Sequence, residues 1–412
     1  MSLFDIIAIL ITLTALFSYI NFRYLKLPTT IGVMFISLAL SIGLILMKYT
    51  GLDFTTHAKS IIGEIDFNET LMQGMLSYLL FAGALHVNLD DLADQKWIIA
   101  ILATLGVVCS TFLIGTLFWI VLDWTDLQLS YIYCLLFGAL ISPTDPIAVL
   151  AILRTAGASK ALETKITGES LFNDGVGVVV FILIASIAIS GNDVTTGSVI
   201  TLFMKEAVGG VLYGLLLGFV IYWLLKQVDN YQVEILLTLA LVTGGYASAS
   251  ALHISGPIAV VVAGLMIGNQ GRLLAMSNLT REHLDTFWEL IDEILNAILF
   301  VLIGLEVLIL SFEFNIIILG LLAIAIVLAG RLVSVGLPVT VLRLRSEISP
   351  HAIKILTWGG LRGGISVALA LSIPPGPERE IILTVTYCVV IFSILVQGLT
   401  IGKLIRWSTK TI

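Results

Sequence analysis

The sequence predicts an all-α protein that crosses a membrane many times, with about thirteen transmembrane helices. Of its 412 residues, 58% are apolar and only 12% are charged, whereas soluble domains carry about 25% charged residues. Apolar runs of about 20 residues, the length that spans a bilayer core, recur from one end of the chain to the other. Polar and Gly/Pro clusters separate these runs, and no soluble domain fits between them.

The expected helices follow from these runs in order. The first run, MSLFDIIAILITLTALFSYI, lacks the basic lead and the cleavage site of a signal peptide, so we expect it to be a membrane helix. The predicted helices cover residues 3–21, 28–48, 67–87, 98–122, 131–152, 166–189, 198–225, 232–252, 255–269, 288–310, 314–342, 350–373 and 380–407. Lysine and arginine concentrate in alternate connections, as cytoplasmic loops do. This predicts an N-terminus outside and a C-terminus in the cytoplasm.

An odd helix count fits two inverted six-helix repeats joined by a linking helix. The repeats would be residues 1–190 and 232–412, with the linker at 191–231, and all of 1–412 would form one membrane domain without a soluble regulatory domain. Helices 5 and 12 then correspond to each other. They are the most interrupted segments, containing ISPTDP and WGGLRGG, and we expect both to be unwound.

The motif SPTDP places a carboxylate beside free backbone carbonyls. Pro143 and Pro146 each remove a backbone donor and disfavour helix before them. Carbonyls near Thr144 lose their helical partners, and such backbone is tolerated at membrane depth only inside protein or beside a wet cavity. With Asp145, these oxygens are hard ligands for a small cation. Asp145 could also cap the second half-helix, and the two roles are compatible.

The motif GESLFNDGVG, residues 168–177, places acids next to a long apolar run. Ser170 and Asp174 share one helical face, and Glu169 and Asn173 share an adjacent face. An acid inside the membrane is expensive and is a functional candidate by default. The alternative is a helix N-terminus at the membrane surface, where the acids would complement the helix dipole.

Two arginines also fall inside predicted helices. Arg331, in IAIVLAGRLVSVGL, needs a buried partner, for which Glu169 is our candidate. Arg362 lies among four glycines, and it either neutralises carbonyl ends opposite Asp145 or snorkels to the cytoplasmic boundary. His253 and Glu306 are weaker signals, interpreted as a polar cap and an outer-boundary residue.

Five segments together resemble the NhaP/NHE-like branch of the cation:proton antiporters. They are SPTDPIAVLAIL, GESLFNDGVGVVVF, HISGPIAVVVAGLMIGN, FVLIGLEV and WGGLRGGISVALALSIP. The resemblance implies a homodimeric secondary transporter, not an enzyme, that exchanges H+ for Na+ or Li+ with 1:1 electroneutral stoichiometry by alternating access. It implies no cofactor and no nucleic acid, with the lipid bilayer, Na+ and H+ as partners, in a bacterial or archaeal inner membrane. A K+/H+ antiporter, a cation channel and an intramembrane aspartyl protease are the alternatives.

The resemblance also implies that the unwound helices 5 and 12 cross near the ion, and it implies roles for individual residues. Asp174 would be the carboxylate that takes Na+ or H+, and the Na+ ligands would be Asp174, Ser170, Thr144 and Asp145. Glu169 and Asn173 complete the implied cation- and proton-binding set, and Arg331 and Arg362 would be charge-compensating. One departure concerns the third helix, where relatives often carry an acid and this chain reads LLFAGALHV with Ala82.

Overall fold

A computed structural model describes most of the chain. The described residues are 3–49, 59, 67–125, 127–145, 149–150, 153, 160–190, 197, 201, 203–310, 313–343 and 351–410. Their regular structure is helical apart from one isolated bridge between Asp145 and Leu361.

The helices are α1 (Leu3–Ile20), α2 (Thr29–Tyr49), α4 (Phe67–Glu69), α5 (Leu76–Leu85), α6 (Leu89–Asp94), α7 (Lys96–Ile101), α8 (Val107–Leu122), α9 (Tyr131–Leu140), α11 (Lys160–Ser190), α13 (Gly209–Leu225), α14 (Tyr231–Ala251), α15 (Gly256–Met266), α16 (Arg272–Ala275), α17 (Asn278–Glu306), α18 (Phe314–Leu342), α19 (Ala352–Trp358), α20 (Gly364–Leu371), α21 (Pro377–Phe392) and α22 (Gly398–Lys410). Short π-helical stretches adjoin several of them, at Asn21–Leu25, Thr70–Met75, Leu102–Gly106, Met204–Val208, Ile267–Gly271 and Ser393–Gln397.

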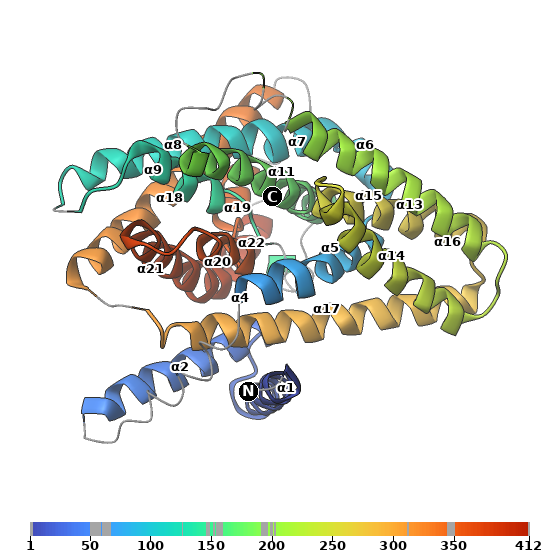
Figure 1. Cartoon of the computed structure of the whole chain (residues 1–412), viewed down its shortest axis with the longest axis horizontal. Helices are drawn as coiled ribbons and strands as arrows, with labels where there is room; N and C mark the ends of the chain where they lie inside the picture. The colour runs from blue at the N-terminus through green and yellow to red at the C-terminus, as the bar shows by residue number, and fades with distance from the viewer. Residues whose placement is uncertain are drawn as a thin grey trace.

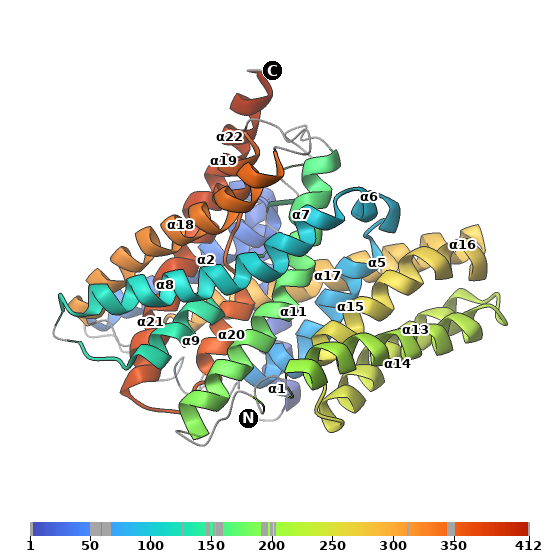
Figure 2. The ribbon, with the colours of Figure 1, turned by 90° about the horizontal axis from the view of Figure 1, so that it is seen from above.

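The helices form two packed groups beside one long helix (Figure 1). One group contains α8, α9, α18, α20 and α21, and the other contains α5, α13, α14 and α15. α17 runs along both groups and packs on its other side against α1 and α2. Figure 2 shows the start of α1 and the end of α22 at opposite ends of the molecule.

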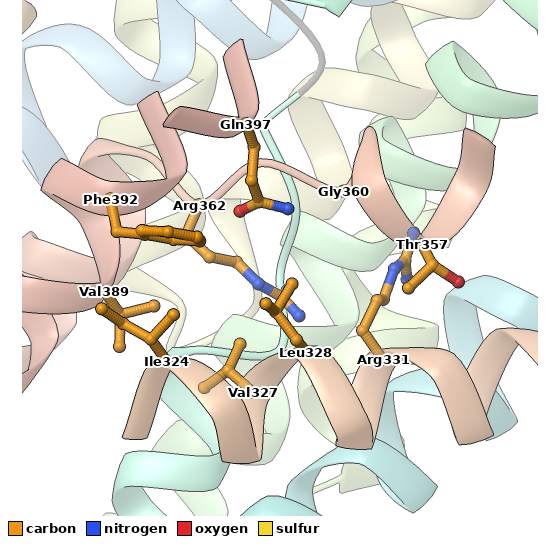
Figure 3. A pocket seen from close by; sticks show the side chains of 10 residues that line it. All are labelled: Ile324, Val327, Leu328, Arg331, Thr357, Gly360, Arg362, Val389, Phe392 and Gln397. Carbon is orange, nitrogen blue, oxygen red and sulfur yellow. The ribbon is translucent and has the colours of Figure 1, made fainter. Parts of the chain in front are cut away.

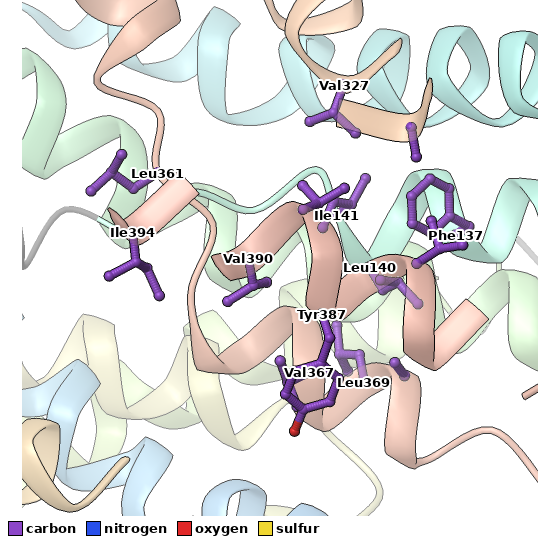
Figure 4. Close-up of a cluster of buried hydrophobic side chains, with 14 of the residues drawn as sticks. Phe137, Leu140, Ile141, Val327, Leu361, Val367, Leu369, Tyr387, Val390 and Ile394 are labelled. Carbon is purple, nitrogen blue, oxygen red and sulfur yellow. The ribbon is translucent and has the colours of Figure 1, made fainter. Parts of the chain in front are cut away.

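Each group has its own apolar core. In the first, buried side chains such as Phe137, Leu140, Tyr387 and Val390 surround the ends of the broken helices (Figure 4). In the second, the Phe81 and Trp288 rings lie 4.6 Å apart. Within the described part of the chain, protein therefore encloses the interrupted segments.

Each predicted membrane helix contains a helix in the described residues. Among the described residues, eight helices are long and apolar enough to cross a membrane, and three shorter apolar helices accompany them. The all-helical, multi-pass class is therefore confirmed. The division into inverted repeats and a linking helix stays a prediction.

Two predicted helix starts are wrong. α11 begins at Lys160 instead of 166, and α17 begins at Asn278 instead of 288. Both extensions carry charged residues, which the sequence interpretation assigned to loops. In α17 the Ser277 hydroxyl accepts a hydrogen bond from the Thr280 N–H at 3.4 Å, and Leu284 is buried. The charged first turns of this helix therefore have both a cap and an apolar face.

Candidate cation-binding site

Two non-helical segments meet at the centre of the first group. The chain leaves the helix after α9 at Leu140, and it leaves helix again between α19 and α20, over 359–363. The Asp145 N–H donates to the Leu361 carbonyl at 2.8 Å, which pairs the two segments in antiparallel fashion. We call this junction the crossing. Pro146 lies outside the described residues.

Arg362 ties the second segment to the first. Its side chain is 1% exposed, so it does not snorkel to a boundary. Its Nη1 donates to the Pro143 carbonyl at 2.7 Å and also to the Ser142 carbonyl. Its own N–H donates to the Ser393 hydroxyl at 2.8 Å. One guanidinium thus satisfies carbonyls that the end of α9 leaves without helical partners.

Thr144 is held by α11 from two positions. The Ser170 hydroxyl donates to the Thr144 carbonyl. The Asn173 side chain accepts from the Thr144 N–H at 3.2 Å and donates to the Thr144 hydroxyl at 2.8 Å. Ser170 and Thr144 lie together as the predicted ligand set requires. The geometry gives Asn173 a positioning role, because both of its polar atoms are engaged by Thr144.

Asp174 lies one turn beyond Ser170 on the same helix and is 8% exposed. Its carboxylate interacts electrostatically with Asp145 and with Arg362. α11 begins more than two turns before Glu169, which is 1% exposed. The alternative that these acids cap a helix end at the membrane surface is therefore excluded for both.

Glu169 and Arg331 form a buried ion pair. Arg331 Nη1 lies 2.5 Å from Glu169 Oε1, and both side chains are at most 8% exposed. A Cβ on Gly360 would lie 2.7 Å from Arg331 Nε, so glycine at this position admits the guanidinium. The pair joins α11 to α18 next to the crossing, and breaking such a buried pair on one side costs about 3–5 kcal/mol.

A small cavity lies between the two arginines (Figure 3). Its volume is about 10 Å³, which is room for about one water molecule. In the described part of the chain, Arg331 Nε, Arg362 Nε and Nη2, and the Thr357 hydroxyl have no hydrogen-bond partner. These atoms belong to three residues that line the cavity, and the unpartnered donors suit a polar occupant.

Three residues flagged by the sequence lie elsewhere. His253 has φ 52° just after α14, and the Ile254 N–H donates to the Ala249 carbonyl at 3.1 Å, so His253 ends the helix as a left-handed residue. Glu306 is 7% exposed at the end of α17 and is therefore buried; its position at the outer boundary stays a prediction. Ala82 is 1% exposed and packs in the second core.

Ser142 and Ser393 were missed by the sequence interpretation. Each contributes a backbone or hydroxyl oxygen to Arg362. The only available signal was the position of Ser142 before Pro143, because Ser393 lies in an apolar run without a motif.

The crossing gathers oxygen atoms of three kinds from four residues. Carboxylates come from Asp145 and Asp174, a carbonyl from Thr144 and a hydroxyl from Ser170. These are hard ligands of the type that small cations prefer. Paired broken helices of this kind define a class of polytopic membrane transporters.

The chain belongs to the sodium/hydrogen exchanger family. The profile of that family's transmembrane region matches residues 10–407. The chain is 53% identical to the Na(+)/H(+) antiporter NhaP of Pseudomonas aeruginosa over 98% of this chain and 96% of that protein. It is 37% identical to the Na(+)/H(+) antiporter NhaH of Halobacillus aidingensis over 93% of each.

A solved structure shares the fold. The sodium proton antiporter MjNhaP1 from Methanocaldococcus jannaschii superposes with a TM-score of 0.76, covering 98% of this chain and 99% of that chain, at 20% identity.

Proposed function

We propose that the protein is a secondary antiporter that exchanges Na+ for H+ across a membrane at Asp174. The observation that carries the proposal is the burial of Asp174 on α11 beside two unwound, cross-paired segments. The first segment supplies the Thr144 carbonyl and the Asp145 carboxylate, and α11 supplies the Ser170 hydroxyl. The names of the relatives and the shared fold support the same activity. They do not favour the K+/H+ or aspartyl protease alternatives.

The exchange follows from competition for one carboxylate. A charged carboxylate in a poorly solvated site is costly unless a proton or a cation neutralises it. With Na+ bound, oxygens of Asp174, Asp145, Thr144 and Ser170 replace part of its hydration shell. With H+ bound, Asp174 is neutral and the cation is excluded. Because the site crosses the membrane only when it is neutralised, the transport of Na+ is coupled to the transport of H+.

Asn173 supports electroneutral 1:1 exchange. Its amide is uncharged and engaged by Thr144, so Asp174 has no second acid beside it on the helix. Each half-cycle then carries one Na+ or one H+ on one carboxylate. Arg362 provides a fixed positive charge that partners the broken-helix carbonyls in both states.

The protein is an integral, multi-pass membrane protein, as its family and its apolar helices show. We propose a bacterial or archaeal inner membrane, an outside N-terminus and a cytoplasmic C-terminus, supported by the placement of lysine and arginine. We also propose a homodimer, which rests on the family resemblance. Native mass spectrometry in mild detergent tests the dimer.

Asp174→Asn tests the function. Purified protein in liposomes with a trapped pH dye should show Na+-driven pH change that persists when the membrane potential is clamped. We expect the rate to fall more than about 100-fold in the variant. An amide has no negative charge with which to bind the cation, and it does not take up and release a proton as a carboxylate does. Asp90→Asn is the matched control, since Asp90 is exposed in α6. Retained Na+-dependent proton flux in a folded Asp174→Asn protein would contradict the assignment.

A further inference from the structure

One face of α17 carries a row of polar residues that no part of the proposed mechanism uses. Asp285, Glu289, Asp292, Asn296 and Leu299 follow one another at steps of three or four, so they lie along a single helical face. Exposure falls along the row from Glu289 onward: Glu289 is exposed, Asp292 is half-buried and Asn296 is 1% exposed. The row therefore leads from the surface into the protein.

The buried end of this face reaches the crossing. A Cβ on Gly364 would lie 2.6 Å from a Leu299 methyl group, so α17 contacts the start of α20 there. The next residue back, Gly363, lies directly against the Asp145 side chain. Asn296 and Asp292 are one and two turns before Leu299 on the same face. Figure 1 shows α17 passing below α20 and α5 along this line.

Asn296 and Asp292 present oxygen atoms at this position. Asn296 Nδ2 donates to the Asp292 carboxylate at 3.0 Å and to the Asp292 carbonyl at 2.8 Å. Within the described residues, Asn296 Oδ1 is buried and has no hydrogen-bond partner. An unpartnered buried acceptor is unfavourable unless a donor or a cation meets it.

Asp292 also differs from Asp285, the first acid on the row. Asp285 is held by Arg272 in an ion pair. No lysine or arginine of the described chain pairs with Asp292. The face that carries Asp292 ends at Leu299, which contacts Gly364, and the adjacent Gly363 lies against the Asp145 side chain.

We propose that Asp292 and Asn296 form a second oxygen site for a monovalent cation, on the path between the solvent end of α17 and the crossing. The inference rests on the proposed function and adds a waiting position to it. A carboxylate and an amide oxygen are hard ligands, and a nearby anion raises the local concentration of cations. Asp292 and Asn296 bind the incoming ion before it moves inward to the crossing.

The test separates binding from turnover and one side of the membrane from the other. Asp292→Asn is reconstituted with a defined orientation, and Na+ is varied on each side in turn. We expect the KM for Na+ on the side of the α17 start to rise between about threefold and tenfold. The maximal rate should stay within about twofold, and the KM on the opposite side should not change. Asp292→Glu should restore the wild-type KM, and Asp90→Asn, at an exposed aspartate outside the row, is the control.

The outcomes distinguish this inference from the proposed function. Wild-type protein without Na+-driven proton flux would refute the proposed function. Wild-type flux with an unchanged KM in Asp292→Asn would overturn only the second site. An equal change of KM on both sides, or of maximal rate alone, would indicate a structural role and would also overturn it.

A direct measurement covers the case in which Asp292→Asn does not fold. The wild-type protein is crystallised with Tl+, whose anomalous signal marks monovalent cation sites. A peak between the Asp292 carboxylate and Asn296 Oδ1, in addition to one at the crossing, is the expected result. A peak at the crossing alone would overturn the inference.

Discussion

The two halves of the crossing are broken by different chemistry. The segment after α9 contains Pro143 and bears the acid Asp145, while the segment between α19 and α20 is rich in glycine and bears Arg362. Proline removes donors and leaves carbonyls free. Glycine lets a bulky cation and a neighbouring carboxylate approach the backbone. The comparison teaches that the first segment supplies the oxygens and the second supplies the compensating charge and the space.

Removing the cation of the second segment should have the largest effect. Arg362→Ala leaves the Ser142 and Pro143 carbonyls without their donor and removes the charge next to Asp174. We expect exchange to be lost and the free energy of unfolding to fall by about 3–5 kcal/mol. Liposome flux and thermal unfolding in detergent measure both. Arg23→Ala, at an exposed arginine, should change neither the flux nor the thermal unfolding. Normal flux in Arg362→Ala would show that exchange does not need the positive charge of the second segment.

Filling the space of the second segment should have the next largest effect. A Cβ on Gly363 would collide with the Asp145 side chain, so Gly363→Ala should displace that carboxylate. We expect the KM for Na+ to rise about tenfold, equivalent to about 1.4 kcal/mol of binding free energy.

Gly244→Ala is the matched control for that prediction. No atom lies within 4 Å of a Cβ at Gly244, inside α14, and alanine there should be neutral or should stabilise the helix by about 0.5–1 kcal/mol. A Gly363→Ala protein with wild-type KM would show that the close approach to Asp145 is unimportant.

Changing the charge next to the first segment should have a smaller effect. Asn173→Asp keeps an acceptor for the Thr144 N–H but loses the donor to the Thr144 hydroxyl. It also adds a second acid beside Asp174. We expect flux to fall less than tenfold, by about 1 kcal/mol for one lost hydrogen bond, and to become sensitive to the membrane potential. Flux measured with and without valinomycin and K+ tests this. Flux that is insensitive to the membrane potential would show that Asn173 does not set the charge balance of exchange.

A pair far from the crossing should have the smallest effect. Lys160, which is 76% exposed, lies 2.7 Å from Asp91. The hydrogen bond to Asp91 and its negative charge raise the pKa of Lys160, so any contribution is present at neutral pH and is lost as the pH rises through that raised pKa. Because an exposed pair contributes little, Lys160→Ala should leave flux and the melting temperature unchanged at pH 7. A marked loss would mean that effects at the crossing are not specific to it.

Much of the fold could be predicted because lipid imposes simple rules. A helix such as α18, whose predicted and observed limits coincide at 314–342, shows its length directly as an apolar run. The start of α17 could not be predicted this way, because charged residues on its first turns hide the helical periodicity. Its N-terminal cap and its packing neighbours are visible only in the structure.

The candidate site was predictable in part. Spacing placed Ser170 with Asp174 and identified Thr144 and Asp145 as neighbours of free carbonyls. Spacing also placed Asn173 with Glu169 on one face, yet Asn173 holds Thr144 while Glu169 pairs with Arg331. Rotamers and neighbouring helices decide these directions, and a sequence pattern contains neither.

By itself, the sequence determined the membrane class, the two interrupted helices and the identity of the buried charges, because hydropathy, proline and glycine act locally. The tertiary structure alone decided that the Asp145 N–H meets the Leu361 carbonyl, that Arg362 serves carbonyls more than 200 residues away in sequence, and that one face of α17 reaches the same point. These are contacts between distant segments, and they form only when the whole bundle packs.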